Sequence, residues 1–254
     1  MSVRPTTRLV AHGEPPRWFT FSGLAALSLP HVTTTRHFPG VTAPSQPTAP
    51  FNDDTREALR EAGLDLARVA HARQVHGADV LRAPVGGDWA GAGDILATTE
   101  RRVPLAIFTA DCLAVTLWDS IAHVLVVAHV GWRGTARGAA RAAVRAAVQA
   151  GARAGQLHAA IAPSIGPCCY EVDEPVMRAF AEAEPRRWKR WFQPVREGHA
   201  MLDLWAANEA ILADAGVDPS QIENPRVCTA CHLDLLYSYR KGNRGRLVTV
   251  AALP

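Results

Sequence analysis

The chain has 254 residues, of which 48% are hydrophobic, and a formal net charge of +3. It has no run of five basic residues, which argues against a nucleic-acid surface, and no apolar run near the ~18 residues of a membrane span. Five cysteines, an odd number, favour a reducing compartment over a disulfide framework. Because the first residues lack the apolar centre of a signal peptide, we expect a cytoplasmic protein.

Strand-like and helical patterns alternate along the first half of the chain. In order, they predict a helix over Thr55 to Ala62, a strand and turn over Val69 to Leu81, and a glycine-rich loop over Pro84 to Gly93. Buried strands follow at Leu105 to Phe108, Val115 to Trp118 and Val124 to Ala128.

The second half continues this alternation without an internal repeat. It predicts a helix over Thr135 to Ala150, a strand over His158 to Ala162, helices over Glu174 to Ala183 and Leu202 to Gly216, and a final strand over Arg246 to Leu253. Gly216 occupies a helix C-terminal cap position. Because no linker interrupts these patterns, we expect one α/β domain.

The segment AHVGWRG at residues 128–134 predicts a buried strand that turns into a helix. His129 is thereby presented at the strand end, and Gly131 and Gly134 allow the backbone to approach a ligand closely. The first helical turn has unpaired N–H groups with Arg133 beside them, which favours a phosphate or carboxylate site. The alternative is an ordinary turn with a packed histidine.

Two further side chains of metal-ligand type lie at or near predicted strand ends. RQVHG at 73–77 places His76 there, and TADC at 109–112 places Cys112 there. Together with His129 they form a set of two imidazoles and one thiolate, which suits zinc and leaves a fourth position open. Their spacing matches no short regular motif, so packed, inert side chains are the alternative interpretation.

Another cysteine pair occurs in CTACH at residues 228–232. The sequence matches a haem attachment motif, which is rejected here because haem attachment needs export. Cys228 and Cys231 could instead bind a structural zinc with Cys168, Cys169 or His232. No second paired motif at finger-like spacing completes such a site, so packed thiols are favoured.

Several sequence blocks together resemble one family. They are QVHG, the Asp-Cys pair of TADC, AHVGWRG, IGPCCYEV at 165–172, LDL at 202–204, and CT followed by SYRKGNRGR between 228 and 246. In this order they resemble the bacterial YfiH-like or laccase-domain family, whose members are called polyphenol oxidase, peptidoglycan editing factor or purine nucleoside phosphorylase. The resemblance covers residues 33–254, with 1–32 as an N-terminal segment of the same domain. It implies an α/β fold of mixed β-sheets layered with helices.

The resemblance also implies a function. It implies a catalytic zinc at His76, Cys112 and His129, with copper as the alternative metal. The implied reaction cleaves adenosine, inosine and methylthioadenosine with phosphate to the free base and ribose 1-phosphate, with adenosine deaminase activity at the same site. The expected partners are a purine nucleoside and phosphate, with no nucleic acid and no membrane, in a monomer or homodimer. The family pattern is shortened between Thr35 and Asp54.

Other residues take secondary roles in this interpretation. Arg133, Gly131, Gly134 and the helix after them would hold the phosphate. Asp111 is a candidate general acid or base, or else it orients the loop that presents Cys112. Contacts to base, sugar or phosphate are assigned to Arg36, Arg73, Tyr170 and Arg240, each of which has a structural alternative.

Three other functional classes stay open. A metal-independent cysteine hydrolase or amidase that edits peptidoglycan precursors would use Cys112 as nucleophile and His129 as base. A copper-dependent polyphenol oxidase is the second, although none of the ten histidines forms the His-x-His pair of a true multicopper laccase. The third is a binding module that retains the anion site without turnover.

Overall fold

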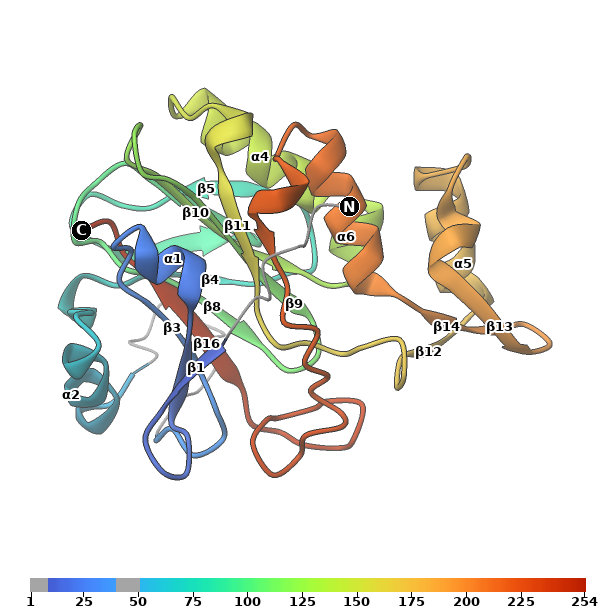
Figure 1. The fold of residues 1–254 in the computed structure, drawn as a ribbon, viewed down its shortest axis with the longest axis horizontal. Helices are drawn as coiled ribbons and strands as arrows, with labels where there is room; N and C mark the ends of the chain where they lie inside the picture. Colours follow the sequence, from blue (N-terminus) through green and yellow to red (C-terminus); the bar gives the residue numbers. More distant parts are fainter. Residues whose placement is uncertain (1–8, 40–50) are drawn as a thin grey trace.

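Two large β-sheets pack face to face in the computed structural model, which describes residues 9–39 and 51–254 (Figure 1). The first sheet has the order β1 (Leu9–His12), β2 (Trp18–Phe21), β3 (His31–Thr34), β16 (Leu247–Ala251), β8 (Leu105–Thr109), β4 (Ala70–Arg73) and β6 (Asp88–Ala92). The second has the order β15 (Ile222–Glu223), β11 (His158–Ile161), β9 (Leu113–Asp119), β10 (Val124–Val130), β7 (Ile95–Thr98) and β5 (Val80–Arg82).

The central strand β10 shows why the two sheets pack in layers. Val124 and Val126 pack on one face with helices α4 (Ala139–Gln149) and α6 (Leu204–Asp214). Leu125 and Val127 point the other way, into an apolar layer shared with the first sheet. Strand residues alternate between faces, so a strand buried on both faces reads as a continuous apolar run.

The outer face of the first sheet is covered by α2 (Asp53–Glu61). Its Ala58 and Leu59 pack on Phe108 and Val248. Figure 1 shows α2 on one side of the sheets and α4 on the other. The architecture is therefore helix, sheet, sheet, helix, a single mixed α/β domain.

Most elements expected from the sequence are present, and two expectations are wrong. The single helix expected over Thr135 to Ala150 is two helices, α3 (Trp132–Ala136) and α4, because Gly138 adopts a left-handed conformation with φ +80° between them. The glycine-rich loop over Pro84 to Gly93 contains the edge strand β6, which pairs in parallel with β4. Glycine lowers strand propensity, so pairing rather than composition makes this strand.

The remaining elements were not expected. Strands β1 to β3 and helix α1 (Ser22–Ala26) lie in the N-terminal segment, and the strands extend the first sheet. A small third sheet of β12 (Glu171–Asp173), β14 (His199–Leu202) and β13 (Phe192–Arg196) lies beside α5 (Glu174–Ala183), at the edge of the molecule in Figure 1. No helix within the described residues has the length and apolar character needed to cross a bilayer. Residues 40–50 of the shortened segment lie outside the described residues.

Candidate metal centre and adjoining cavity

Two chain turns and the end of one strand carry His76, Cys112 and His129. His76 follows β4, Cys112 ends the short turn from β8 to β9, and His129 is the penultimate residue of β10. Their ligand atoms all lie within 4.8 Å of one another. The His76 and His129 rings are nearly perpendicular, with centroids 4.8 Å apart. The structure therefore gathers the three side chains proposed as ligands, two from turns and one from a strand end.

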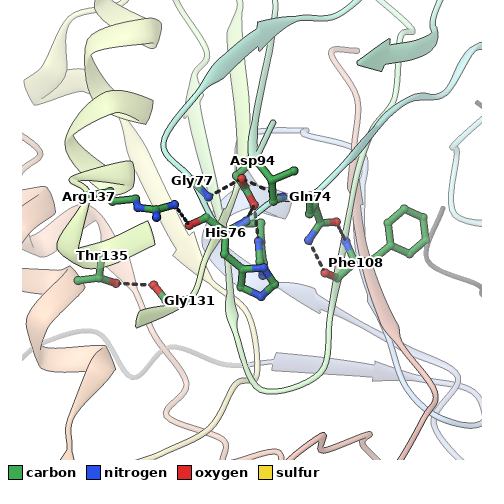
Figure 2. Close-up of polar contacts among 10 residues, drawn as sticks. Gln74, His76, Gly77, Asp94, Phe108, Gly131, Thr135 and Arg137 are labelled. Carbon is green, nitrogen blue, oxygen red and sulfur yellow. Dashed lines mark hydrogen bonds and ion pairs between the residues drawn. The ribbon is translucent and has the colours of Figure 1, made fainter. Parts of the chain in front are cut away.

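The backbone around these turns explains how the side chains meet. The side-chain amide of Gln74 continues the β4 to β8 pairing (Figure 2). Its NH₂ group donates to the Phe108 carbonyl at 2.7 Å, and its oxygen accepts from the Phe108 backbone amide at 2.8 Å. His76 then adopts a left-handed conformation, with φ +58°, and Asp111 adopts one with φ +91°. Both residues turn the chain sharply, and the ligand atoms of His76 and Cys112 come within 4.8 Å of each other.

Asp94 fixes this arrangement from the beginning of β7. Its buried carboxylate accepts the Nδ1–H of His129 at 2.7 Å, and it accepts the backbone amides of Gly77 at 2.7 Å, His76 at 3.0 Å and Val75 at 3.2 Å (Figure 2). Because His129 uses Nδ1 for this bond, its Nε2 remains for a metal. A carboxylate behind a histidine is the common way to orient such a ligand.

The charges of the cluster favour a thiolate. Burial by itself raises the pKa of Cys112, but the neighbouring His129 and His76 rings outweigh burial and lower the pKa to about 6. Burial by itself lowers the pKa of His129, but Cys112 and Asp94 outweigh it and raise the pKa to about 9. At neutral pH the cysteine is therefore the anion that metal binding or nucleophilic attack requires.

The two glycines expected to approach a ligand lie close to the protein's own atoms. A Cβ on Gly131 would come within 2.8 Å of Cys112 Sγ and 3.5 Å of His76 Cδ2. A Cβ on Gly134 would come within 3.2 Å of the Gly77 carbonyl oxygen. Gly131 therefore borders the ligand cluster, and Gly134 lets α3 pack against the turn that carries His76.

Both carboxylate oxygens of Asp111 are engaged. One accepts the Thr229 hydroxyl at 2.6 Å, and the other accepts the Arg240 backbone amide at 2.7 Å. These bonds connect the turn that presents Cys112 to the segment that contains Thr229 and Arg240. They favour the orienting role of Asp111 over the role of general acid or base.

A cavity of about 520 Å³ is lined by Tyr170, on which the charge of Cys112 acts, although His76, Cys112 and His129 do not line it themselves. Tyr170 and Arg240 line it together, with the Arg240 guanidinium 5.2 Å from the centroid of the Tyr170 ring. The other lining residues are Trp132, Glu171, Val172, Asp173, Val176, Arg196 and His199. Burial, reinforced by the negative charge of Cys112, raises the pKa of the Tyr170 hydroxyl, so it stays protonated. A larger cavity of about 810 Å³ lies around β15 and α6, and none of the proposed site residues lines it.

The other three arginines proposed from the sequence lie at different places relative to this cavity. Arg133 is exposed and lies over the Trp132 ring, 4.3 Å from its centroid, and its charge acts on Tyr170. Arg36 instead donates to the Leu233 carbonyl. Arg73 is exposed at the end of β4. Of these three, only Arg133 is placed beside the residues that line the cavity.

Sequence reasoning missed Asp94 and Trp132. Asp94 directly precedes the apolar run of β7, where a lone acidic residue is unusual and could have been noticed. Trp132 lies inside AHVGWRG, but only the fold shows that its ring lines a cavity.

Comparisons with a family model and with individual relatives show what this chain is similar to. Residues 49–254 match the family described as multi-copper polyphenol oxidoreductase laccase. The chain is 38% identical over 242 residues to a purine nucleoside phosphorylase of Deinococcus radiodurans, covering 90% of both chains. It is 36% identical over 158 residues to adenosine deaminase RL5 of an unknown prokaryotic organism, covering 61% of this chain and 60% of that protein.

The fold agrees with the same family. The crystal structure of Bacillus licheniformis hypothetical protein YfiH superposes with a TM-score of 0.84 at 24% identity, covering 94% of this chain and 97% of that one. The expected YfiH-like α/β fold is therefore confirmed.

Proposed function

Because this chain belongs to the multi-copper polyphenol oxidoreductase laccase family, we propose that it is a zinc-dependent purine nucleoside phosphorylase. The proposed substrates are adenosine, inosine and methylthioadenosine, which are cleaved with phosphate to base and ribose 1-phosphate. The observation that carries this proposal is the group of His76, Cys112 and His129, because the charge of Cys112 acts on Tyr170, which lines a cavity with Trp132 and Arg240. The name of the Deinococcus radiodurans relative supports the same reaction.

The donor set fits zinc. Two imidazoles and a thiolate are ligands that zinc prefers, and three protein ligands leave a position for substrate. Asp94 orients His129, and Gly131 leaves room beside Cys112. When bound there, zinc would supply a Lewis acid beside the reacting groups. Copper is the alternative metal for the same ligands.

The chain's own residues would place the two substrates. Phosphorolysis passes through an oxocarbenium-like state, so phosphate must approach the sugar carbon as the base leaves. Arg133 and Arg240 provide the positive charge for phosphate, and the Trp132 and Tyr170 rings provide apolar faces for the base. The protonated Tyr170 hydroxyl can donate a hydrogen bond to sugar or base. Gly131 and Gly134 shape the turn beside them.

The test is phosphate dependence. Adenosine or inosine is incubated with the purified protein with and without phosphate, and base and ribose 1-phosphate are separated by chromatography. Arg133→Ala should raise the phosphate KM about ten- to hundredfold, equivalent to ~1.5–3 kcal/mol for a charge-assisted bond, with zinc content unchanged. Lysine there should recover only part of the loss. Arg145→Ala, which removes an exposed arginine on α4, is the matched control.

Other outcomes would redirect the proposal. Phosphate-independent cleavage at an equal rate would make the protein a hydrolase. An unchanged phosphate KM in Arg133→Ala would move the anion site elsewhere. Release of ammonia from adenosine would add the deaminase activity that the name of the RL5 relative suggests.

A second candidate function is a metal-independent cysteine hydrolase. The Cys112 pKa of about 6 beside a His129 pKa of about 9 favours it, because this is a thiolate and imidazolium pair. The thiolate would attack an acyl carbon, His129 would protonate the leaving amine, and water would hydrolyse the thioester. Full activity in metal-stripped protein, lost in Cys112→Ala, would support this function and exclude the zinc phosphorylase.

A further inference from the structure

Four cysteines form a second cluster in the described part of the chain. Cys168 and Cys169 lie between β11 and β12, and Cys228 and Cys231 lie after β15. The four sulfur atoms all lie within 4.8 Å of one another. Cys231 Sγ is 3.5 Å from the sulfur of Cys168 and 3.5 Å from that of Cys169. Residues about 60 positions apart in the sequence thus supply a compact set of four thiols.

The backbone holds the two segments in register. Ser164 and Cys228 form an isolated parallel β-bridge, in which the Ser164 amide donates to the Val227 carbonyl at 3.2 Å and the Thr229 amide donates to the Ser164 carbonyl at 3.1 Å. A turn then brings the Cys231 amide within 3.2 Å of the Cys228 carbonyl. This turn places both sulfurs of the Cys228 to Cys231 pair on the side of Cys168 and Cys169.

One backbone amide points directly at the cluster. The Gly166 amide donates to Cys228 Sγ at 3.2 Å. A Cβ on Gly166 would come within 2.5 Å of the Trp205 ring, so only glycine fits at this position. A hydrogen bond from a backbone amide stabilises a sulfur that carries negative charge.

The sulfur separations match a single tetrahedral ion. Four sulfurs at ~2.3 Å from a central zinc are ~3.8 Å from one another. Cys231 Sγ is 3.5 Å from two of the other sulfurs, and all four lie within 4.8 Å of one another. A disulfide would bring two sulfurs to ~2.05 Å, much closer than the 3.5 Å between Cys231 and either Cys168 or Cys169. A cluster of several irons would need a wider cage than this one.

The exposure of the four side chains also differs from that of packed thiols. Packing explains Cys228, which is buried, and half-buried Cys169, which packs against the same core. It does not explain Cys168 and Cys231, which are exposed. Exposed thiols gain little from packing, whereas exposed ligands allow an ion to enter. The interpretation of this group as packed thiols therefore leaves two of its four members unexplained.

We propose that Cys168, Cys169, Cys228 and Cys231 bind one Zn²⁺ ion in a structural site separate from the His76, Cys112 and His129 cluster. Each thiol gives up its proton to solvent as it binds the ion. Four protein ligands leave no open position, which is typical of a structural rather than a catalytic zinc.

The ion would hold together two segments of the chain, one leading from Cys169 to Tyr170 and the other from Cys231 to Arg240, and both end at residues that line the cavity. Cys169 directly precedes Tyr170, and Thr229 lies between the other two ligands and donates to Asp111 at 2.6 Å. The chain that continues from Cys231 reaches Arg240, whose amide also bonds to Asp111. The site would thus hold Tyr170 and Arg240 in place from outside the cavity.

The test counts zinc in the full-length protein purified under reducing conditions. Elemental analysis should find one zinc per chain fewer in Cys231→Ser and in the double variant Cys168→Ser, Cys231→Ser than in the wild type. Cys112→Ala should retain this zinc, which separates the result from that of the other cluster. His232→Ala is the matched control, since it changes an exposed neighbour of Cys231, and it should keep the wild-type count.

A measurement on the wild type covers the case in which the variants do not fold. The exposed Cys168 and Cys231 should not react with a thiol reagent in the zinc-loaded protein. They should react once a chelator is added, as zinc is released. X-ray absorption on Cys112→Ala should show only sulfur neighbours at ~2.3 Å from zinc.

Four results would each overturn the proposal. They are an unchanged zinc count in the double variant, immediate reaction of the exposed thiols without zinc release, iron or copper in place of zinc, and a disulfide among the four cysteines in the mass spectrum of unreduced protein.

Discussion

Asp94→Asn tests the geometry of the metal centre most directly. One carboxylate oxygen accepts bonds from His129 Nδ1 and the His76 amide, and the other accepts bonds from the Gly77 and Val75 amides. Asparagine has the same shape but only one acceptor oxygen. Whichever way its amide turns, two of the four donors face an NH₂ group.

The expected loss of stability follows from the two donors that lose their acceptor. A buried donor left without an acceptor costs about 1–3 kcal/mol, and the Val75 amide is the longest and weakest of the four bonds, so we expect a loss of about 2–4 kcal/mol in unfolding free energy. Zinc affinity should fall about ten- to hundredfold, or ~1.4–2.7 kcal/mol, because His129 is no longer held by a carboxylate.

The assay is competition with a chromophoric chelator for zinc, combined with urea unfolding of the same preparation. Asp79→Asn is the matched control, since it makes the same change on an exposed carboxylate nearby. Zinc affinity equal to the wild type in Asp94→Asn would refute the orienting role of Asp94. An equal loss of affinity in Asp79→Asn would attribute the effect to net charge alone.

Three further changes test other parts of the structure. Gly131→Ala should lower zinc affinity at least tenfold, because the new methyl group would press on Cys112 Sγ; unchanged zinc binding would contradict the close contact. Tyr170→Phe should raise the nucleoside KM several-fold without changing zinc content, and an unchanged KM would remove its hydroxyl from the substrate contacts. Burial, together with the charge of nearby His12, lowers the pKa of His31 below 6.5. As pH falls, the unfolded state therefore takes up the proton before the folded state does. Unfolding free energy should therefore fall as pH drops from about 7.5 to about 5.5, and His31→Asn should flatten that slope; an identical slope in the variant would contradict the assignment.

The proposed ligands Cys112 and His129 were accessible to sequence reasoning because each lies beside an apolar strand, whereas His76 follows the polar-containing strand AHAR. The runs before Cys112 and His129 predict buried strands, and a polar ligand-type side chain at such an end is easily noticed. Their meeting in space was not derivable from spacing. It depends on β4 and β8 lying in one sheet while β9 and β10 lie in the other.

The features that sequence reasoning missed depend on single residues or on contacts between residues far apart in the chain. The strand β6 contains Gly91 and is stabilised by its parallel partner β4, a contact that local propensity cannot report. The break between α3 and α4 depends on one residue, Gly138, inside a segment otherwise rich in good helix formers. Asp94 was missed for the same reason, since its partners come from the turn after β4 and from β10.

Asp111 explains how the two cysteine-containing clusters are related. It immediately precedes Cys112, and its carboxylate receives the Thr229 hydroxyl and the Arg240 amide. A proton donor or acceptor in catalysis must be free to exchange its proton with substrate, whereas both oxygens of Asp111 are used inside the protein. Its position instead makes the Cys112 turn and the segment from Cys228 to Arg240 one hydrogen-bonded unit. The cluster of Cys168, Cys169, Cys228 and Cys231 at one end of that unit would therefore set the geometry of Cys112 at the other.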